Sequence, residues 1–134
     1  MKKMALLMLL MLLLSGCGQN TVHTQQTTEE EKVVYVNITA QQAKEIMDAQ
    51  TGYVILDTRT QEEYDESHIP GAVLLPYDKV AEKAQTVLPD KNQQILVYCR
   101  SGRRSKIAAG ALVELGYTNI KEFGGIIDWP YETE

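Results

Sequence analysis

One short stretch of the chain combines a nucleophile with a cluster of positive charge. It runs from Cys99 to Lys106 and reads Cys-Arg-Ser-Gly-Arg-Arg-Ser-Lys. Four of the chain's 13 Lys and Arg residues lie in these eight positions, although the formal net charge of the chain is −5. A thiolate is the reactive form of cysteine, and an electropositive setting stabilises it. The stretch therefore predicts a nucleophilic cysteine in an anion-binding loop.

The expected surroundings of Cys99 favour the same chemistry. An apolar strand over residues 95–98 precedes it and a helix over 104–115 follows. The loop between them points backbone N–H groups inward, and the helix adds the positive end of its dipole. Gly102 can adopt the positive φ that lets such a loop curl around a centre. The alternative is a buried structural cysteine before a solvated basic helix. Because basic residues oppose the dipole at a helix N-terminus, their placement here indicates a ligand.

The elements that must position this loop alternate between strand and helix through residues 33–134. Apolar runs predict strands at 33–36, 53–56, 72–75, 94–98 and 119–123. Helices are expected after the capping boxes Thr39–Gln42 and Thr60–Glu63, and at 78–87 and 104–115. This order predicts an α/β fold with a central parallel sheet of about five strands, flanked by helices on both faces. Ligands of such sheets bind beyond the carboxyl ends of the strands, where Cys99 is expected.

The N-terminal part reads as a targeting segment and a tether. Two lysines precede an apolar run over residues 4–14, which is shorter than the roughly 20 residues that span a bilayer. The run ends in Leu-Ser-Gly-Cys, which resembles a bacterial lipobox with Cys17 as its cysteine. We expect a lipoprotein signal peptide over 1–16, then a lipidated Cys17 and flexible tether over 17–32. The alternative is an ordinary secretory signal. Either reading places the protein outside the cytoplasm, and the first anchors it to a bacterial membrane.

Length and composition exclude several classes of protein. The chain has 134 residues, enough for one ordinary domain. Its two cysteines, Cys17 and Cys99, exclude a disulfide-stapled miniprotein and a four-cysteine zinc site. The negative net charge argues against general nucleic-acid binding. We expect no metal, no cofactor and no nucleic-acid partner.

With these motifs the chain resembles the rhodanese family. The loop Cys99–Arg104 matches that family's Cys-Arg-x-Gly-x-Arg active-site loop, and Ser105 continues the match. Residues 57–72 resemble its upstream signature, with Ser67 where glycine is common. Gly124-Gly125, which we expect to form a turn, and the following Trp129 resemble its C-terminal signature. The resemblance implies a single rhodanese domain over residues 33–134.

The resemblance also implies sulfurtransferase chemistry. In that family the loop cysteine attacks the outer sulfur of thiosulfate or a similar anionic donor, and a thiol or cyanide-like acceptor then takes the sulfur from the persulfide. Cys99 would be the nucleophile, with the loop N–H groups stabilising donor and persulfide. The implied substrate-binding residues are Arg100, Ser101, Gly102, Arg103 and Arg104. Asp57, Arg59 and Ser105 are expected beside them, and an Asp57–Arg59 ion pair is the structural alternative to substrate contact.

Three other functions stay open at this point. A phosphatase or arsenate reductase of the related loop type needs Cys-x5-Arg, whereas Arg104 stands five positions after Cys99 and Ser105 stands six after it. A non-catalytic rhodanese-like binding module typically lacks the cysteine. A protein-to-protein sulfur carrier would keep Cys99 and use a partner protein as acceptor. We favour the sulfurtransferase over these three alternatives.

Overall fold

The computed structural model describes residue 32 and residues 34–134, and the predicted signal peptide, Cys17 and nearly all of the predicted tether lie outside this range. The described chain forms a five-stranded sheet in the order β1-β5-β4-β2-β3, and every strand pair is parallel. The strands are β1 Val36–Asn37, β2 Tyr53–Asp57, β3 Val73–Leu74, β4 Gln94–Cys99 and β5 Ile120–Gly125. The predicted parallel sheet is confirmed.

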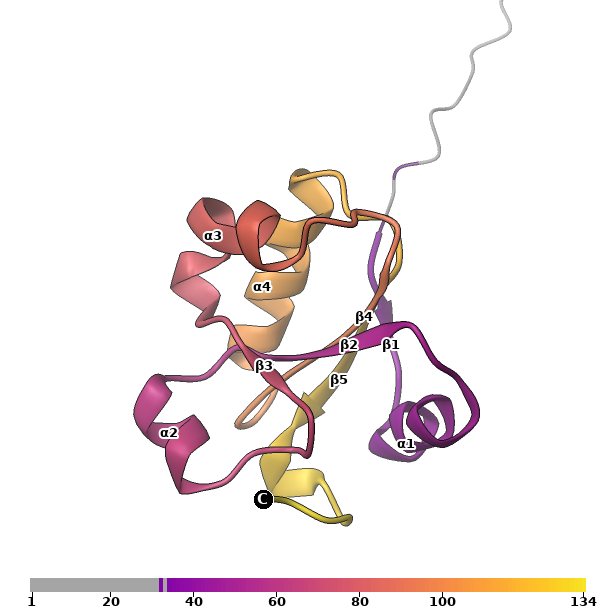
Figure 1. Ribbon diagram of the computed structural model, residues 1–134, viewed down its shortest axis with the longest axis vertical. Coiled ribbons are helices and arrows are strands. Elements are labelled where there is room, and N and C mark those ends of the chain that lie inside the picture. The colour runs from indigo at the N-terminus through magenta and orange to yellow at the C-terminus, as the bar shows by residue number, and fades with distance from the viewer. Residues whose placement is uncertain (1–31, 33) are drawn as a thin grey trace, which may run out of the picture. The chain divides into compact units, whose positions relative to one another are not determined.

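Helices cover both faces of this sheet, also as predicted (Figure 1). One face carries α3 and α4, and α1 lies against the other. The bounds are α1 Ala40–Ala49, α2 Gln61–Glu66, α3 Val80–Val87 and α4 Arg103–Glu114, with 3-10 turns η1 Tyr77–Lys79 and η2 Ile126–Asp128. No helix of the described residues is long and apolar enough to cross a membrane.

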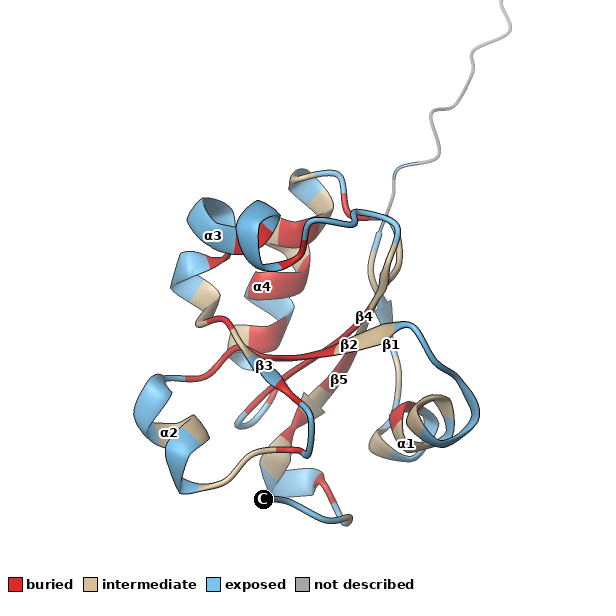
Figure 2. Cartoon of the chain, in the orientation of Figure 1, coloured by how far each residue is buried: buried red, intermediate tan, exposed pale blue. Residues whose placement is uncertain are grey.

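The sheet separates two hydrophobic clusters, and Figure 2 shows the buried residues concentrated in its central strands and on the inner side of α4. The cluster under α3 and α4 includes Leu56, Val97, Leu112 and Tyr117. The cluster on the α1 side includes Ala43, Leu96 and Tyr98. Neighbouring residues of β4 thus face opposite clusters, as in a strand buried on both sides. This double burial fixes the end of β4, where Cys99 lies.

Both predicted capping boxes are present and start the helices where the sequence places them. The Thr39 side chain accepts the N–H of Gln42, whose side chain accepts the N–H of Thr39 in return. Thr60 and Glu63 exchange the same pair of bonds at the start of α2. Each box satisfies N–H groups that the first turn of a helix leaves without partners.

The structure corrects several predicted element boundaries. The first strand is shorter and later than predicted, covering only Val36–Asn37, because it pairs with β5 alone and Val36 remains 53% exposed. The predicted helix over 78–87 is divided into η1 and α3. The prediction that Gly124-Gly125 form a turn was wrong: both belong to β5, where Gly125 pairs with Cys99.

Candidate active site

Cys99 is the last residue of the central strand, at the carboxyl edge of the sheet. Strand β4 is hydrogen-bonded to β2 on one side and to β5 on the other. The register shifts between Val97 and Cys99, so Cys99 pairs with Gly125 beyond the regular ladder. Cys99 is 1% exposed. The thiol is therefore held at the base of the loop rather than on the surface.

The loop after Cys99 turns backbone N–H groups onto the sulfur. The N–H of Gly102 donates to Sγ over 2.9 Å. Burial raises the pKa of the Cys99 thiol, but hydrogen bonds of the loop, among them those from the N–H groups of Ser105, Gly102 and Ser101, outweigh burial and lower it overall. Hydrogen bonds to the charged form explain this direction, because they stabilise the thiolate. Backbone dipoles are thus the groups that surround the sulfur in this loop, for which the sequence predicts anion binding.

Two glycines make this loop geometry possible. Gly102 has φ of 107°, in the left-handed region that side chains disfavour, and it is the N-cap of α4. Gly125 lies against the loop so closely that a Cβ there would sit 1.9 Å from the carbonyl oxygen of Arg100. That carbonyl accepts the N–H of Ile127 over 3.2 Å, so its oxygen points away from the sulfur. Strand β5 and η2 therefore hold the outer side of the loop while its N–H groups face inward.

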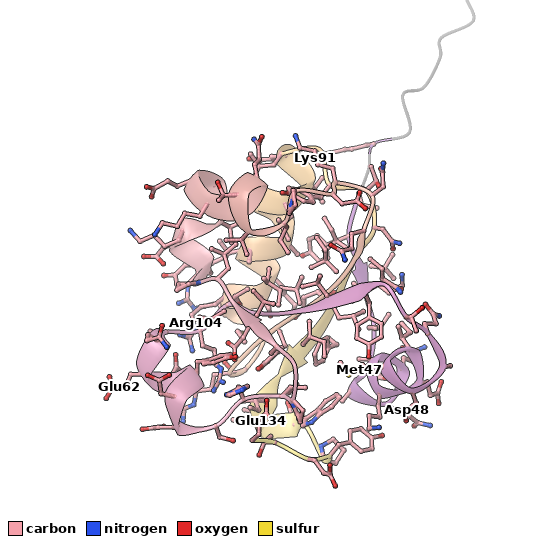
Figure 3. The ribbon with its side chains drawn as sticks, viewed as in Figure 1. Met47, Asp48, Glu62, Lys91, Arg104 and Glu134 are labelled. Atoms are coloured by element: carbon pink, nitrogen blue, oxygen red, sulfur yellow. The ribbon has the colours of Figure 1, made fainter. Side chains whose placement is uncertain are left out.

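Arg104 closes the loop onto α2 rather than pointing into it. Its guanidinium donates two hydrogen bonds to the Glu63 carboxylate, over 2.7 and 2.8 Å, and Figure 3 shows Arg104 beside α2. The Arg104 hydrogen bonds, opposed by burial and aided by the Thr60 N–H, lower the pKa of Glu63 to about 2. One carboxylate, that of Glu63, therefore both caps α2 and holds Arg104 at the start of α4.

The remaining predicted binding residues line the outer part of the loop. Arg100, Ser101 and Arg103 are exposed, whereas Gly102 is buried. The Arg103 guanidinium lies 5.8 Å from the centre of the Tyr77 ring, a cation–π distance that orients its charge. Two arginines of the loop are thus exposed, whereas Cys99 itself is buried.

Asp57 and Arg59 form a closed cluster at the end of β2. Asp57 is fully buried and pairs with Arg59 over 2.7 Å. The Tyr98 hydroxyl also donates to Asp57, over 2.5 Å, and Arg59 donates a further bond to the carbonyl of Ser67 over 2.7 Å. We call Asp57, Arg59 and Tyr98 the Asp57 cluster. Its hydrogen bonds hold the segment after β2 beside the Cys99 loop.

Ser105 and Glu122 lie behind the sulfur. Ser105 Oγ is 3.3 Å from Cys99 Sγ and 2.6 Å from Glu122 Oε1. Glu122 is 3% exposed and also accepts the N–H of Gly124 over 2.9 Å. Sequence reasoning placed Ser105 beside the site but missed Glu122. The signal was available, because Glu122 shares the buried face of β5 with Ile120, two residues earlier.

This arrangement supports nucleophilic attack on an anionic substrate. The thiol has a lowered pKa, hydrogen-bond donors lie around the sulfur, and two arginines of the same loop, Arg100 and Arg103, are exposed. Residues 34–134 contain no group of three or more His, Cys, Asp or Glu arranged to hold a metal ion.

Comparison with known proteins places this geometry in a family. The chain is 41% identical over 73 residues to the thiosulfate sulfurtransferase PspE of Escherichia coli, covering 54% of this chain and 70% of PspE. It is 37% identical over 92 residues to the putative sulfur carrier protein YrkF of Bacillus subtilis, covering 68% of this chain and 49% of YrkF. A solved structure described as "rhodanese with anions from E. coli" superposes with a TM-score of 0.58 at 36% identity, covering 61% of this chain and 96% of that one. The pattern of the rhodanese-like domain matches residues 39–130. This chain belongs to the rhodanese-like domain family, which includes sulfurtransferases.

Proposed function

We propose that this protein is a sulfurtransferase that moves sulfane sulfur from thiosulfate or a similar anionic donor to a thiophilic acceptor through a persulfide on Cys99. The observation that carries the proposal is the buried Cys99 sulfur, which accepts the N–H of Gly102 at the centre of a loop of inward N–H groups. The similarity to the thiosulfate sulfurtransferase PspE supports the same chemistry.

The proposed reaction is a double displacement. The Cys99 thiolate attacks the outer sulfur of thiosulfate, the S–S bond of the donor breaks, and sulfite leaves with the bonding electron pair. Negative charge then lies on the outer sulfur of the persulfide, where the loop N–H groups stabilise it. An acceptor thiolate or cyanide attacks that sulfur, and Cys99 leaves as a thiolate. Sulfur is transferred with no net change of charge on the enzyme over the cycle.

The proposed division of labour follows the positions of the arginines. Arg100 and Arg103 are exposed at the rim and attract the donor, which carries two negative charges. Arg104 is engaged by Glu63 and positions the start of α4. The donor is then held by rim charge and backbone N–H groups together.

Intact mass measurement tests the proposal. Protein beginning at Gly18 is incubated with thiosulfate, weighed, and weighed again after cyanide. We expect a gain of one sulfur atom that cyanide removes, and no gain in Cys99→Ser. No gain in the unchanged protein, with Cys99 shown to be reduced, would contradict the proposal and favour a non-catalytic binding module.

We further propose that Cys17 carries a lipid that anchors the domain to a bacterial membrane, outside the cytoplasm. The charged start, apolar run and Leu-Ser-Gly-Cys order of the first 17 residues support this proposal. Cys17→Ser is expected to block processing and lipidation. Labelling with a radioactive fatty acid measures the second directly, and label retained in Cys17→Ser would contradict the proposal.

A further inference from the structure

Glu122 is the buried charge that the loop chemistry leaves unexplained. It is 3% exposed, on the face of β5 that packs against α4. Burying a carboxylate is costly unless hydrogen bonds compensate for its lost hydration. Two donors reach it: the Gly124 N–H over 2.9 Å and the Ser105 hydroxyl over 2.6 Å. No Lys, Arg or His of the described residues forms a salt bridge with it.

The direction of the Ser105 hydroxyl proton determines whether Ser105 donates a hydrogen bond to Cys99 Sγ or accepts one from it. A serine hydroxyl has one proton to donate and two lone pairs that accept. Ser105 Oγ lies 2.6 Å from Glu122 Oε1, 3.0 Å from the Gly102 carbonyl oxygen and 3.3 Å from Cys99 Sγ. The Glu122 carboxylate can only accept, and its contact with Ser105 is the shortest of the three, so the Ser105 hydroxyl donates its proton to Glu122. Ser105 then faces the sulfur as an acceptor.

This arrangement treats the thiol, the thiolate and the persulfide differently. A thiol can donate its S–H to Ser105 Oγ, and the contact is favourable. A thiolate has no proton to donate, so it faces a lone pair and loses the hydroxyl as a partner. A persulfide carries its charge on the outer sulfur, where loop N–H groups rather than Ser105 provide the compensation.

We propose that Glu122 is a positioning residue which, by holding the Ser105 proton away from Cys99, disfavours the bare thiolate relative to the persulfide. This inference rests on the proposed sulfurtransferase function and deepens it. The loop N–H groups stabilise negative charge on Cys99 Sγ, whereas Glu122 withholds the Ser105 proton from it. This unfavourable effect is absent in the persulfide, because its charge lies on the outer, transferred sulfur. The pair Glu122–Ser105 thus favours the loaded form of the enzyme.

The other charged groups around the sulfur are already paired. Arg104 of α4 binds Glu63 of α2, and Asp57 of β2 binds Arg59. Tyr98 of β4 donates to Asp57. Among the described residues, Glu122 is the ionisable group joined to Cys99 through a single hydroxyl.

The test is the pH profile of Cys99 alkylation by iodoacetamide, measured on the full chain. Tryptic peptide 92–100 contains Cys99 without Cys17, so mass spectrometry reports on this thiol alone. Glu122→Gln can still accept the Gly124 N–H and the Ser105 hydroxyl at the same oxygen, but a neutral amide holds the hydroxyl proton less strongly than a carboxylate does, so the thiolate can compete for that proton. We expect alkylation to become about tenfold faster on the acidic limb of the profile, at pH values below the pKa of Cys99, where the rate follows the fraction of thiolate. The rate on the high-pH plateau, where the thiol is fully ionised, should stay unchanged.

The double variant separates an effect through Ser105 from the field of the carboxylate. In a Ser105→Ala background, Glu122→Gln is expected to change the acidic-limb rate by less than about twofold, because the connecting hydroxyl is gone. Glu114→Gln, with an exposed side chain at the far end of α4, is the matched control and should leave the profile unchanged. Near-ultraviolet circular dichroism establishes that each variant is folded.

Two results would overturn the inference. One is an alkylation profile of folded Glu122→Gln that coincides with that of the unchanged protein. The other is an equal acceleration in both backgrounds, which would indicate a through-space effect only. Should Glu122→Gln fail to fold, Ser105→Ala alone decides: loss of the S–H acceptor is expected to speed alkylation at pH values below the pKa of Cys99, and unchanged or slower alkylation would overturn the inference.

Sulfur loading gives a second readout that distinguishes this inference from the proposed function. At a fixed ratio of thiosulfate to sulfite, Glu122→Gln is expected to lower the ratio of persulfide to free Cys99 about tenfold, since the thiolate gains a hydrogen bond that the persulfide does not use. An altered alkylation profile without any loading by thiosulfate would contradict the proposed donor while leaving the role of Glu122 intact. Normal loading with an unaltered profile would contradict the role of Glu122 alone.

Discussion

Two buried polar regions lie at the same edge of the sheet, at the ends of neighbouring strands, and they use their hydrogen bonds differently. In the Asp57 cluster at the end of β2, the carboxylate is matched by a buried guanidinium and a tyrosine hydroxyl. In the Cys99 loop at the end of β4, backbone N–H groups surround a sulfur that has no cationic side chain in direct contact among the described hydrogen bonds. The first region is a closed ion pair, and the second directs its donors at a nucleophilic sulfur.

The difference shows that buried polar groups at one sheet edge can serve either stability or reactivity. A fully paired charge contributes to the shape of the surrounding segments, and its removal costs stability. Donors arranged around a reactive atom contribute to a reaction, and removal of that atom costs activity.

The largest effect is expected for Cys99→Ser. The oxygen nucleophile cannot form a persulfide, so we expect sulfur transfer to fall by more than about 10³-fold. Because serine nearly preserves the shape of the side chain and accepts the same N–H bond, the free energy of unfolding should change by no more than about 1 kcal/mol. Steady-state assays with thiosulfate and cyanide, together with urea unfolding, measure both quantities. Persistent transfer activity would refute the assignment of Cys99 as nucleophile.

Asp57→Ala, unlike Cys99→Ser, should cause a large loss of stability. It leaves the buried Arg59 guanidinium without its carboxylate, and we expect a loss of about 3–5 kcal/mol in the free energy of unfolding. Urea unfolding measures the loss. The exposed Asp78 provides the control, since Asp78→Ala should change stability by no more than about 0.5 kcal/mol. Equal stability of the two variants would mean that the Asp57 cluster is not structural.

Gly125→Ala joins the two kinds of effect in one change. Its Cβ would overlap the Arg100 carbonyl at 1.9 Å, so the loop must move. We expect a loss of about 1–3 kcal/mol in stability and about 10²-fold in transfer rate, because the N–H groups leave their positions around the sulfur.

Gly110→Ala is the matched control for that glycine. A Cβ at Gly110 meets nothing within 4 Å, and the residue lies inside α4, so alanine should stabilise the protein by about 0.5–1 kcal/mol. Thermal unfolding and the cyanide assay compare the pair. If both glycine variants behaved alike, close packing of β5 against the loop would not control activity.

Glu63→Gln is expected to have the smallest effect, visible mainly through its pH dependence. The Glu63 pKa falls from 4.5 to about 2 in the folded protein, chiefly through the Arg104 hydrogen bonds. Because the folded pKa is the lower one, the ion pair stabilises above pH 4.5 and this contribution is lost as pH falls towards 2.

The measurement is urea unfolding as a function of pH. Glutamine keeps the capping box but not the charge, so the variant should be about 1–2 kcal/mol less stable at pH 7, after allowance for partial exposure. The difference should shrink below pH 4.5. The exposed neighbour Glu62→Gln should show no comparable pH-dependent loss. A difference that stays constant with pH would exclude the ion pair as its source.

Much of the fold could be predicted because its signals are local. Apolar runs marked β2 and β4, and the two capping boxes fixed the first turns of α1 and α2. The strand at the N-terminal edge was predicted too long, because its length depends on pairing with β5, which the local pattern does not contain.

The site was predictable where chemistry follows the chain and unpredictable where distant segments meet. Cys99 and the loop that surrounds it are contiguous in sequence. The partner of Arg104 is Glu63, 41 positions away, and the approach of Gly125 to the loop depends on the register of β5 against β4. Local reasoning assigned Glu63 to a capping box, which is correct, but its second contact required the tertiary structure.

The central place of β4 has a consequence for the motions of the molecule. Its amides are bonded between two other strands, whereas β1 and β3 are two-residue strands at the sheet edges. Amide hydrogens of residues 95–98 should therefore exchange with solvent deuterium only when the whole domain unfolds, while the edges open in local fluctuations. The nucleophile is attached to the slowest-exchanging part of the domain, so fraying at the periphery leaves its position undisturbed.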